Sequence, residues 1–155
     1  QRLRQAIPGI TLRTTLIAGF PGETEEQFAE MCEFIKEQQF DRLGCFAYSA
    51  EENTVAGRME NQWDEETKRR RADIVMQTQS HIMAAKQAAK VGQVLTVLSD
   101  GLDEESGLYL CRTAADAPEI DGCVCVQSDT PLYPGEFYQV KIEDSDDYDL
   151  FGVLA

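Results

Sequence analysis

The chain has 155 residues with 28 acidic side chains, 14 basic ones and one histidine, which give a net charge of −14 at neutral pH. This length accommodates one domain or two small ones. A content of 43% hydrophobic and 27% charged residues is typical of a soluble globular protein. The sequence contains no uninterrupted apolar run of about 18 residues, so we expect no membrane-spanning helix and no membrane partner.

The negative charge is concentrated in the second part of the chain. Residues 1–90 contain 14 acidic and 12 basic side chains, whereas residues 91–155 contain 14 acidic side chains and only Arg112 and Lys141 as bases. Binding of nucleic-acid phosphates requires clustered Lys and Arg. The second part therefore disfavours a nucleic-acid partner and favours a basic one, although an acidic surface also serves solubility alone.

The chain starts at Gln1 within what reads as the end of a helix, so we expect a fragment of a longer protein. Residues 11–19 are rich in β-branched side chains and run into a Gly-Phe-Pro-Gly turn, which predicts a strand. Its first face is apolar and contains Leu12, Leu16 and Ala18. Its second face carries two polar groups and consists of Arg13, Thr15, Ile17 and Gly19. A strand buried on both sides is apolar throughout, so we expect the second face to line a barrel interior or a cleft.

An amphipathic helix follows this strand. Thr24 and Gln27 form a capping box, and apolar residues recur at helical spacing at Phe28, Met31, Cys32 and Ile35. A second strand over Leu43–Tyr48 completes a βαβ unit, whose strands we expect to be parallel. Phe46 and Tyr48 alternate along it and either stack on a flat ligand or fill a core. Because two strands do not form a stable sheet alone, we expect the rest of this domain upstream.

Residues 64–90 predict one long helix with Asp64 as its N-cap. Four consecutive bases, Lys68 to Arg71, cover successive faces of its second turn. Such a run binds phosphate in some proteins, but acids of the first turn are near enough to pair with it, so we interpret it as a solvated face. His81 is isolated further along the helix, and we assign it to the surface rather than to catalysis.

After Gly92, short apolar runs alternate with turn sequences. The predicted strands are 93–99, 107–112, 122–127, 136–143 and 148–154. The predicted turns contain Asp100–Gly101, Ser106–Gly107, Asp121–Gly122 and Pro134–Gly135. Five short strands in sequence predict a small closed β-barrel, which leaves no exposed edge. We therefore predict two domains, 1–90 for an α/β part with its linking helix and 91–155 for the barrel.

The five cysteines do not follow the spacing of a secreted disulfide framework. They are Cys32, Cys45, Cys111, Cys123 and Cys125. Cys123 and Cys125 share one face of a predicted strand, and they either contribute to a metal site or pack in a core. We favour core packing, because no second Cys or His pair is near them in the sequence. Reduced thiols fit a cytoplasmic protein.

Three stretches of the chain resemble the radical-SAM methylthiotransferases. The run from Arg13 to Thr24, which ends in Gly-Phe-Pro-Gly-Glu-Thr, and the run from Phe40 to Ser49 resemble the second half of their catalytic barrel. The C-terminal strands resemble the TRAM domain that ends those enzymes. The run from Arg112 to Gly122, with Asp-Ala-Pro-Glu-Ile-Asp-Gly, is most similar to the branch that modifies an aspartate of a small-subunit ribosomal protein.

This resemblance implies a fold of the α/β plus all-β class. It would contain a βαβ segment of a partial radical-SAM, TIM-like barrel, a long linking helix and a five-stranded, OB-like TRAM β-barrel. The resemblance also implies an enzyme that uses S-adenosyl-L-methionine (SAM) and two 4Fe-4S clusters. One cluster would cleave SAM to a radical that takes a hydrogen from the aspartate β-carbon, and the other would deliver the sulfur of the methylthio group.

The cluster-binding cysteines of that family are absent from this chain. Neither a C-x-x-x-C-x-x-C motif nor the three cysteines of the second cluster are found, and we expect both sets upstream of Gln1. We therefore assign no metal ligand and no catalytic residue here, and we expect these 155 residues alone to be inactive.

The resemblance carries over part of the SAM-binding wall, which consists of Arg13, Thr15, Ile17, Gly19, Phe46 and Tyr48. Ile17 and Gly19 are expected beside the adenine, and Arg13 or Thr15 near the methionyl end. The segment 50–56 departs from the family pattern by replacing two prolines and a glycine, so we give it no role. The TRAM barrel would dock the basic ribosomal protein through Asp116, Glu119 and Asp121.

Two rival hypotheses stay open from the sequence. A transfer-RNA adenosine methylthiotransferase of the same family would carry a basic TRAM surface, which residues 91–155 do not offer. A non-catalytic β-barrel adaptor with a helical stalk would need the first 60 residues to fold without partners, which a lone βαβ unit does not favour. Under the leading hypothesis we expect a monomer that binds a small-subunit ribosomal protein and no nucleic acid.

Overall fold

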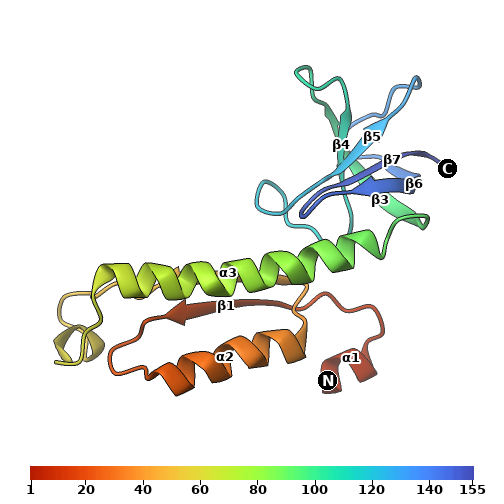
Figure 1. Cartoon of the computed structure of the whole chain (residues 1–155). Helices are drawn as coiled ribbons and strands as arrows, with labels where there is room; N and C mark the ends of the chain where they lie inside the picture. Colours follow the sequence, from red (N-terminus) through yellow and green to blue (C-terminus); the bar gives the residue numbers. More distant parts are fainter. The chain divides into compact units, whose positions relative to one another are not determined.

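The computed structural model describes residues 1–155 and contains two compact units, Gln1–Ile82 and Met83–Ala155. None of its helices combines the length and the apolar character needed to cross a bilayer. The first unit contains α1 (Arg2–Ala6), β1 (Arg13–Ala18), α2 (Glu25–Gln38), β2 (Arg42–Ala47), the 3₁₀ helix η1 (Ala56–Arg58) and most of α3 (Glu65–Ala88) (Figure 1). The second unit contains the end of α3 and the strands β3 (Val94–Leu102), β4 (Tyr109–Arg112), β5 (Val124–Gln127), β6 (Phe137–Ser145) and β7 (Leu150–Leu154).

In the first unit, β1 and β2 form a two-stranded parallel sheet, and α2 and α3 both pack on one of its faces. Figure 1 shows these helices running alongside β1. The core between helices and sheet consists of Phe28, Cys32, Ile35, Leu43, Val75 and Ile82. Leu16 and Cys45 pack against it from the sheet. The predicted βαβ unit with parallel strands is therefore confirmed.

Both longer helices begin where their sequences predict. Thr24 Oγ1 accepts a hydrogen bond from the Gln27 N–H at 3.2 Å, and Gln27 Oε1 accepts from the Thr24 N–H at 3.0 Å, which completes the capping box of α2. At the start of α3, Asp64 accepts from the Thr67 N–H at 2.8 Å. These side chains satisfy N–H groups of the first turn that have no partner within the helix.

In the second unit, five strands close into a barrel in the order β3-β4-β5-β7-β6. Neighbouring strands are antiparallel except β5 and β7, which are parallel. The interior is filled by side chains that alternate along the strands: Val97, Cys111, Val124, Val126, Val140, Ile142 and Leu150, with Leu132 from a loop. The predicted fold class, α/β plus all-β with a five-stranded barrel, is confirmed.

The end of the first barrel strand differs from the prediction. Asp100–Gly101 is not a turn, because β3 continues to Leu102 through a β-bulge between Ser99 and Gly101. Gly101 has a φ of +124°, which side chains of other residues rarely permit. The chain turns later, where Asp103 accepts from the Ser106 N–H at 3.0 Å. Glycine with positive φ serves both turns and bulges, so the sequence signal does not separate them.

Candidate functional site

The face of the β1–β2 sheet opposite the helices is open around Ile17 and Phe46, although Arg42 at its start is buried. The parallel register pairs Thr15 with Gly44 and Ile17 with Phe46, so these residues share that face. Ile17 is 53% exposed and Phe46 is 65% exposed, and Arg13 and Thr15 are exposed beside them on β1. An apolar pair left open on a sheet marks a surface for binding. The structure thus brings together four of the six residues predicted to line SAM.

The other two predicted residues, Gly19 and Tyr48, lie beyond the strand ends. Gly19 has a φ of +75°, and a Cβ atom there would stand 2.8 Å from Lys68 Cγ, so both backbone and neighbour require glycine. Tyr48 is buried, and its N–H donates to the Ala18 carbonyl at 2.9 Å. Alternation along the strand would place Tyr48 with Phe46, but β2 ends before it is reached.

The Tyr48 side chain packs against an aromatic residue, Phe20, and a basic residue, Lys68. Its ring lies edge-on to Phe20, with the ring centroids 5.2 Å apart, and Lys68 Nζ is 5.5 Å from the Tyr48 centroid. The buried hydroxyl has no hydrogen-bond partner. Leaving a buried polar group unpaired costs about 1–3 kcal/mol. This hydroxyl is therefore a polar group that a ligand or another segment can satisfy.

The turn between β1 and α2 is organised by Glu23. Its Oε1 accepts from the Gly19 N–H at 3.1 Å and from Arg71 Nη1 at 2.6 Å. Its carbonyl accepts from Trp63 Nε1 at 3.0 Å. The Arg71 guanidinium also lies over the Trp63 ring, 4.3 Å from the centroid. The Gly-Phe-Pro-Gly-Glu-Thr segment is thereby tied to α3 and to the loop that precedes it.

Arg71 is fully buried, so the solvated-face interpretation of the basic run is wrong for this residue. Its Nη2 donates to Glu25 Oε1 at 2.6 Å, which gives the guanidinium a second carboxylate. Lys68 is also buried, at 3% exposure, whereas Arg69 and Arg70 are exposed. The four bases therefore divide into two that are buried and paired, Arg71 with Glu23 and Lys68 with Glu65 of the first turn as predicted, and two that face solvent.

Helical periodicity is the signal that could have identified the buried bases. Lys68 and Arg71 lie seven and four residues before Val75, which is fully buried, so all three share one face of α3. A buried guanidinium carries a desolvation cost of several kcal/mol unless it is paired. A partner carboxylate could therefore have been predicted, although the sequence does not say that it is Glu23.

An open pocket of about 450 Å³ lies beside this turn and is lined by residues 22–25 and 61–63. The Gly22 N–H donates to the Asn61 carbonyl at 2.9 Å across it. Its walls offer the Glu25 carboxylate, which already accepts from Arg71, and the Trp63 indole. We assign no chemistry to this pocket.

The three acids predicted to dock a basic partner lie in the loop between β4 and β5. Asp116 Oδ2 accepts from the Thr113 N–H at 2.9 Å and from its hydroxyl at 2.7 Å. Asp121 Oδ2 accepts from the Ala117 N–H at 2.7 Å. Both carboxylates are half-buried and shape the loop. Glu119 lies between them and is exposed, with a left-handed φ of 61°.

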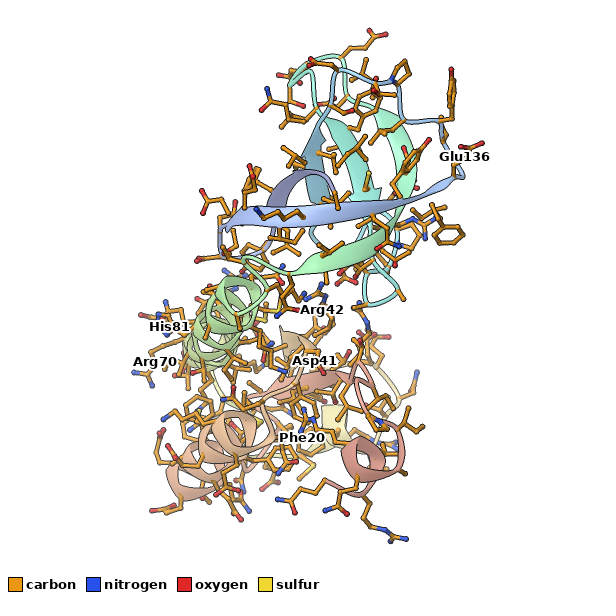
Figure 2. The ribbon with its side chains drawn as sticks, turned by 90° about the vertical axis from the view of Figure 1, so that its right-hand side faces the viewer. Phe20, Asp41, Arg42, Arg70, His81 and Glu136 are labelled. Carbon is orange, nitrogen blue, oxygen red and sulfur yellow. The ribbon has the colours of Figure 1, made fainter.

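Further acids extend the negative surface around the barrel. The exposed ones outside this loop are Asp100, Glu104, Glu105, Asp129, Glu136, Glu143, Asp144, Asp146 and Asp147. Figure 2 shows Glu136 at the outer edge of the barrel. Arg112, one of the two bases of residues 91–155, is paired with Asp100 at 3.0 Å. The net negative charge of residues 91–155 therefore lies on the barrel surface.

The cysteines are all free, and no group of three or more His, Cys, Asp or Glu side chains is placed to hold a metal ion. Burial raises the pKa of both Cys45 and Cys111 to about 11, so these thiols are protonated at neutral pH. Cys123 and Cys125 are half-buried, with their Sγ atoms 3.4 Å apart. Core packing is wrong for this pair, because the alternate residue Val124 fills the barrel interior.

His81 is exposed on α3, which confirms its assignment to the surface. Figure 2 shows His81 and Arg70 pointing outward on the same side of the helix. The histidine therefore lies on the solvent side of α3, away from the core that this helix forms with the sheet.

The barrel matches the family model of the TRAM domain over residues 91–154. Its closed five-stranded topology agrees with that match. Residues 91–154 therefore form a TRAM domain, an acidic barrel that follows an α/β unit with an open sheet face in the sequence.

Comparison of the whole chain with known proteins identifies its relatives. Over 99% of its length, the chain is 48% identical to the ribosomal protein uS12 methylthiotransferase RimO of Bdellovibrio bacteriovorus. The corresponding enzymes of Chromobacterium violaceum and Parabacteroides distasonis are 45% and 46% identical over 98% of the chain. The chain spans about a third of the length of these relatives, 34–35%. The resemblance predicted from its motifs is therefore to proteins named RimO, and it extends over nearly the whole chain.

Proposed function

We propose that the chain is part of a radical-SAM methylthiotransferase that adds a methylthio group to the β-carbon of an aspartate in a small-subunit ribosomal protein. The observation that carries the proposal is the identity of 45–48% with enzymes named for uS12, which extends over nearly the whole chain. The acidic barrel agrees with a basic protein as substrate. The free thiols fit a reducing cytoplasm.

The open face of the β1–β2 sheet is the part of the SAM-binding wall that this chain contributes. Ile17 and Phe46 offer an apolar surface that fits a flat adenine. Arg13 and Thr15 supply a guanidinium and a hydroxyl for the carboxylate and amine at the methionyl end. The residues present therefore fit SAM. Gly19 and Tyr48 lie beyond the strand ends and do not contribute to this surface.

These residues bind and orient SAM and keep water from it. When bound in the complete enzyme, SAM and its clusters supply the hydrogen abstraction and the sulfur, which are the difficult chemical steps. The five cysteines do not fit a cluster, because no three of them lie together. We therefore place the cluster ligands outside this chain and expect the 155 residues alone to be inactive.

That expectation has a direct test. The chain is incubated anaerobically with ferrous iron and sulfide, desalted, and analysed for iron, sulfide and visible absorption. We expect no stoichiometric 4Fe-4S cluster. A stoichiometric four-iron cluster in the isolated chain contradicts the assignment of the ligands to other residues.

The TRAM barrel docks the substrate protein through its negative surface. Glu119 is exposed at the tip of the loop and offers a carboxylate to Lys or Arg of the partner. Asp116 and Asp121 contribute to docking by fixing the loop around it, through their bonds to backbone N–H groups. Attraction between exposed charges is screened by salt. Docking should therefore depend strongly on ionic strength.

Calorimetric titration of the chain with purified uS12 at low and high salt tests this docking. We expect the affinity to fall by about tenfold or more as salt rises. Glu119→Lys should weaken binding at low salt, whereas Glu33→Lys, an exposed acid on α2 of the first unit, should leave it unchanged. An affinity that does not change with salt contradicts docking by charge.

A further inference from the structure

Cys123 and Cys125 form a close pair of thiols on the outer side of the barrel. Their Sγ atoms are 3.4 Å apart, and both side chains are half-buried rather than enclosed. We propose that this pair is a dithiol site that reacts with small-molecule disulfides and closes reversibly into a Cys123–Cys125 disulfide. The proposal does not depend on the methylthiotransferase activity.

The spacing of the pair favours a bond that forms but is easily reduced. A disulfide needs its sulfur atoms about 2.05 Å apart, so they must approach by a little over about 1 Å. Residues two apart on a strand have Cα atoms about 6.6 Å apart, which is near the upper end of the range that disulfides span, about 4.4–6.8 Å. Such a strained bridge is reduced more readily than a relaxed structural one.

The two cysteines differ in how they are held by the sheet. Cys123 precedes β5: its N–H donates to Asp149 Oδ1 at 2.7 Å, and its carbonyl accepts from the Leu150 N–H at the start of β7 at 2.9 Å. Cys125 is held in the sheet, where it is paired with Leu110 on β4 and Phe151 on β7. Closure therefore requires a shift of Cys123, which directly follows the acidic loop and lies at the end of the β5–β7 ladder rather than within it.

The two thiols are not equivalent, which sets the order of the reaction. The contact between the two thiols, whose Sγ atoms are 3.4 Å apart, lowers the pKa of Cys125 and raises the pKa of Cys123. The thiolate is the nucleophile in thiol–disulfide exchange. We therefore expect Cys125 to attack first.

The exchange is balanced in two steps. The Cys125 thiolate attacks one sulfur of the small disulfide, whose S–S bond breaks and releases the first small thiol. Cys123 then loses its proton and attacks the Cys125 sulfur, which expels the second small thiol. Two protein thiols are oxidised, one small disulfide is reduced, and the two protein protons end on the two released thiols.

A metal centre is a weaker interpretation of the same pair. A structural zinc site uses four ligands, and no third His, Cys, Asp or Glu side chain completes a metal-binding group here. Two neighbouring thiols without further ligands instead match the requirements of an intramolecular disulfide.

Mass spectrometry of the full chain with glutathione disulfide tests the proposal. We expect loss of two hydrogen masses, mapped to a Cys123–Cys125 bond, with no lasting glutathione adduct and complete reversal by dithiothreitol. Cys123→Ser should trap a stable adduct on Cys125, and Cys125→Ser should react at least about tenfold more slowly. Cys32→Ser, at a buried thiol, should behave as the unchanged chain.

A persistent adduct on the unchanged chain, without closure, overturns the proposal. Phenylarsine oxide gives an independent readout, because its arsenic binds two neighbouring thiols together with release of water. One equivalent should block both Cys123 and Cys125 from alkylation, and each serine variant should lose this protection while its circular dichroism stays unchanged. Both thiols remaining open to alkylation would also overturn it.

Discussion

The two units of the chain differ in how completely they bury their own apolar surface. In the barrel, inward residues such as Val97 and Ile142 are fully buried, and the strands close on themselves. In the first unit, the helices cover one face of the sheet and leave Ile17 and Phe46 exposed on the other. A closed barrel has no free edge, whereas two strands need further partners to make a complete sheet.

This difference indicates how each unit binds. Under the proposed function, the barrel binds a partner on its outside, where exposed carboxylates such as Glu119 act by charge. The sheet would bind through its open face, where Ile17 and Phe46 offer apolar contact. The barrel therefore suits the capture of a protein, and the sheet suits one wall of an enclosed cofactor site.

The largest expected effect concerns the buried ion pair between Arg71 and Glu23 in the first unit. Arg71→Met removes a buried guanidinium from Glu23 and should lower the free energy of unfolding of this unit by about 3–5 kcal/mol. Trp63, the single tryptophan, lies on Arg71 and reports unfolding by fluorescence during denaturant titration. Arg70→Met, at an exposed neighbour, should change stability by less than about 0.5 kcal/mol. Equal losses would contradict the structural role of Arg71.

A similar contrast separates the two faces of the first unit. Phe28→Ala opens a cavity in the core and should cost about 3–5 kcal/mol. Phe46→Ala acts on the open face, where the side chain is 65% exposed, and should cost less than about 0.5 kcal/mol. The same tryptophan titration measures both variants. A large loss from Phe46→Ala would mean that this face is not open in the chain.

In the barrel, one pair of isoleucines gives the matching test. Ile142→Ala empties a fully buried site and should lower barrel stability by about 2–5 kcal/mol. Ile120→Ala changes a side chain that is 76% exposed and should have an effect below about 0.5 kcal/mol. Hydrogen exchange of the barrel amides distinguishes the two. Comparable loss of protection in both variants would show that the barrel interior is not the stabilising element.

The smallest effect is a pH dependence at the start of α3. Hydrogen bonds from Thr67 hold the pKa of Asp64 below its ordinary value. A carboxyl with a lowered pKa stabilises the folded state above its ordinary pKa, and this contribution is lost as pH falls through the lowered value. Helicity measured by circular dichroism should therefore decline slightly below about pH 4. Asp64→Asn, which keeps a capping side chain, should abolish this component, and Asp73→Asn in the exposed middle of the helix should retain it.

Much of the fold could be predicted because its signals are local. Thr24 and Gln27 cap α2 from within one turn, and Asp64 does the same for α3. Alternating valines at 124 and 126 identify a barrel strand without reference to its neighbours. The open face of β1, with Arg13, Thr15 and Ile17, followed from the contrast between the two faces of this strand, whereas its role toward SAM is a proposal from the resemblance.

The parts that could not be predicted depend on contacts between distant segments. Arg71 looks like a solvated base until α3 is packed against the turn that contains Glu23, which is 48 residues away. β2 ends at Ala47, one residue before Tyr48, so the alternation of side chains along the strand does not extend to Tyr48. Asp116 and Asp121 read as free surface charges, but the loop fold turns their carboxylates onto backbone N–H groups. Each of these outcomes requires tertiary geometry.

The proposed function requires that the TRAM barrel binds a basic protein and no nucleic acid. Parallel titrations of the chain with purified uS12 and with a transfer RNA, at one near-physiological ionic strength, test this requirement. We expect measurable binding of uS12 and no detectable binding of the transfer RNA. Tighter binding of the transfer RNA than of uS12 would contradict the claim.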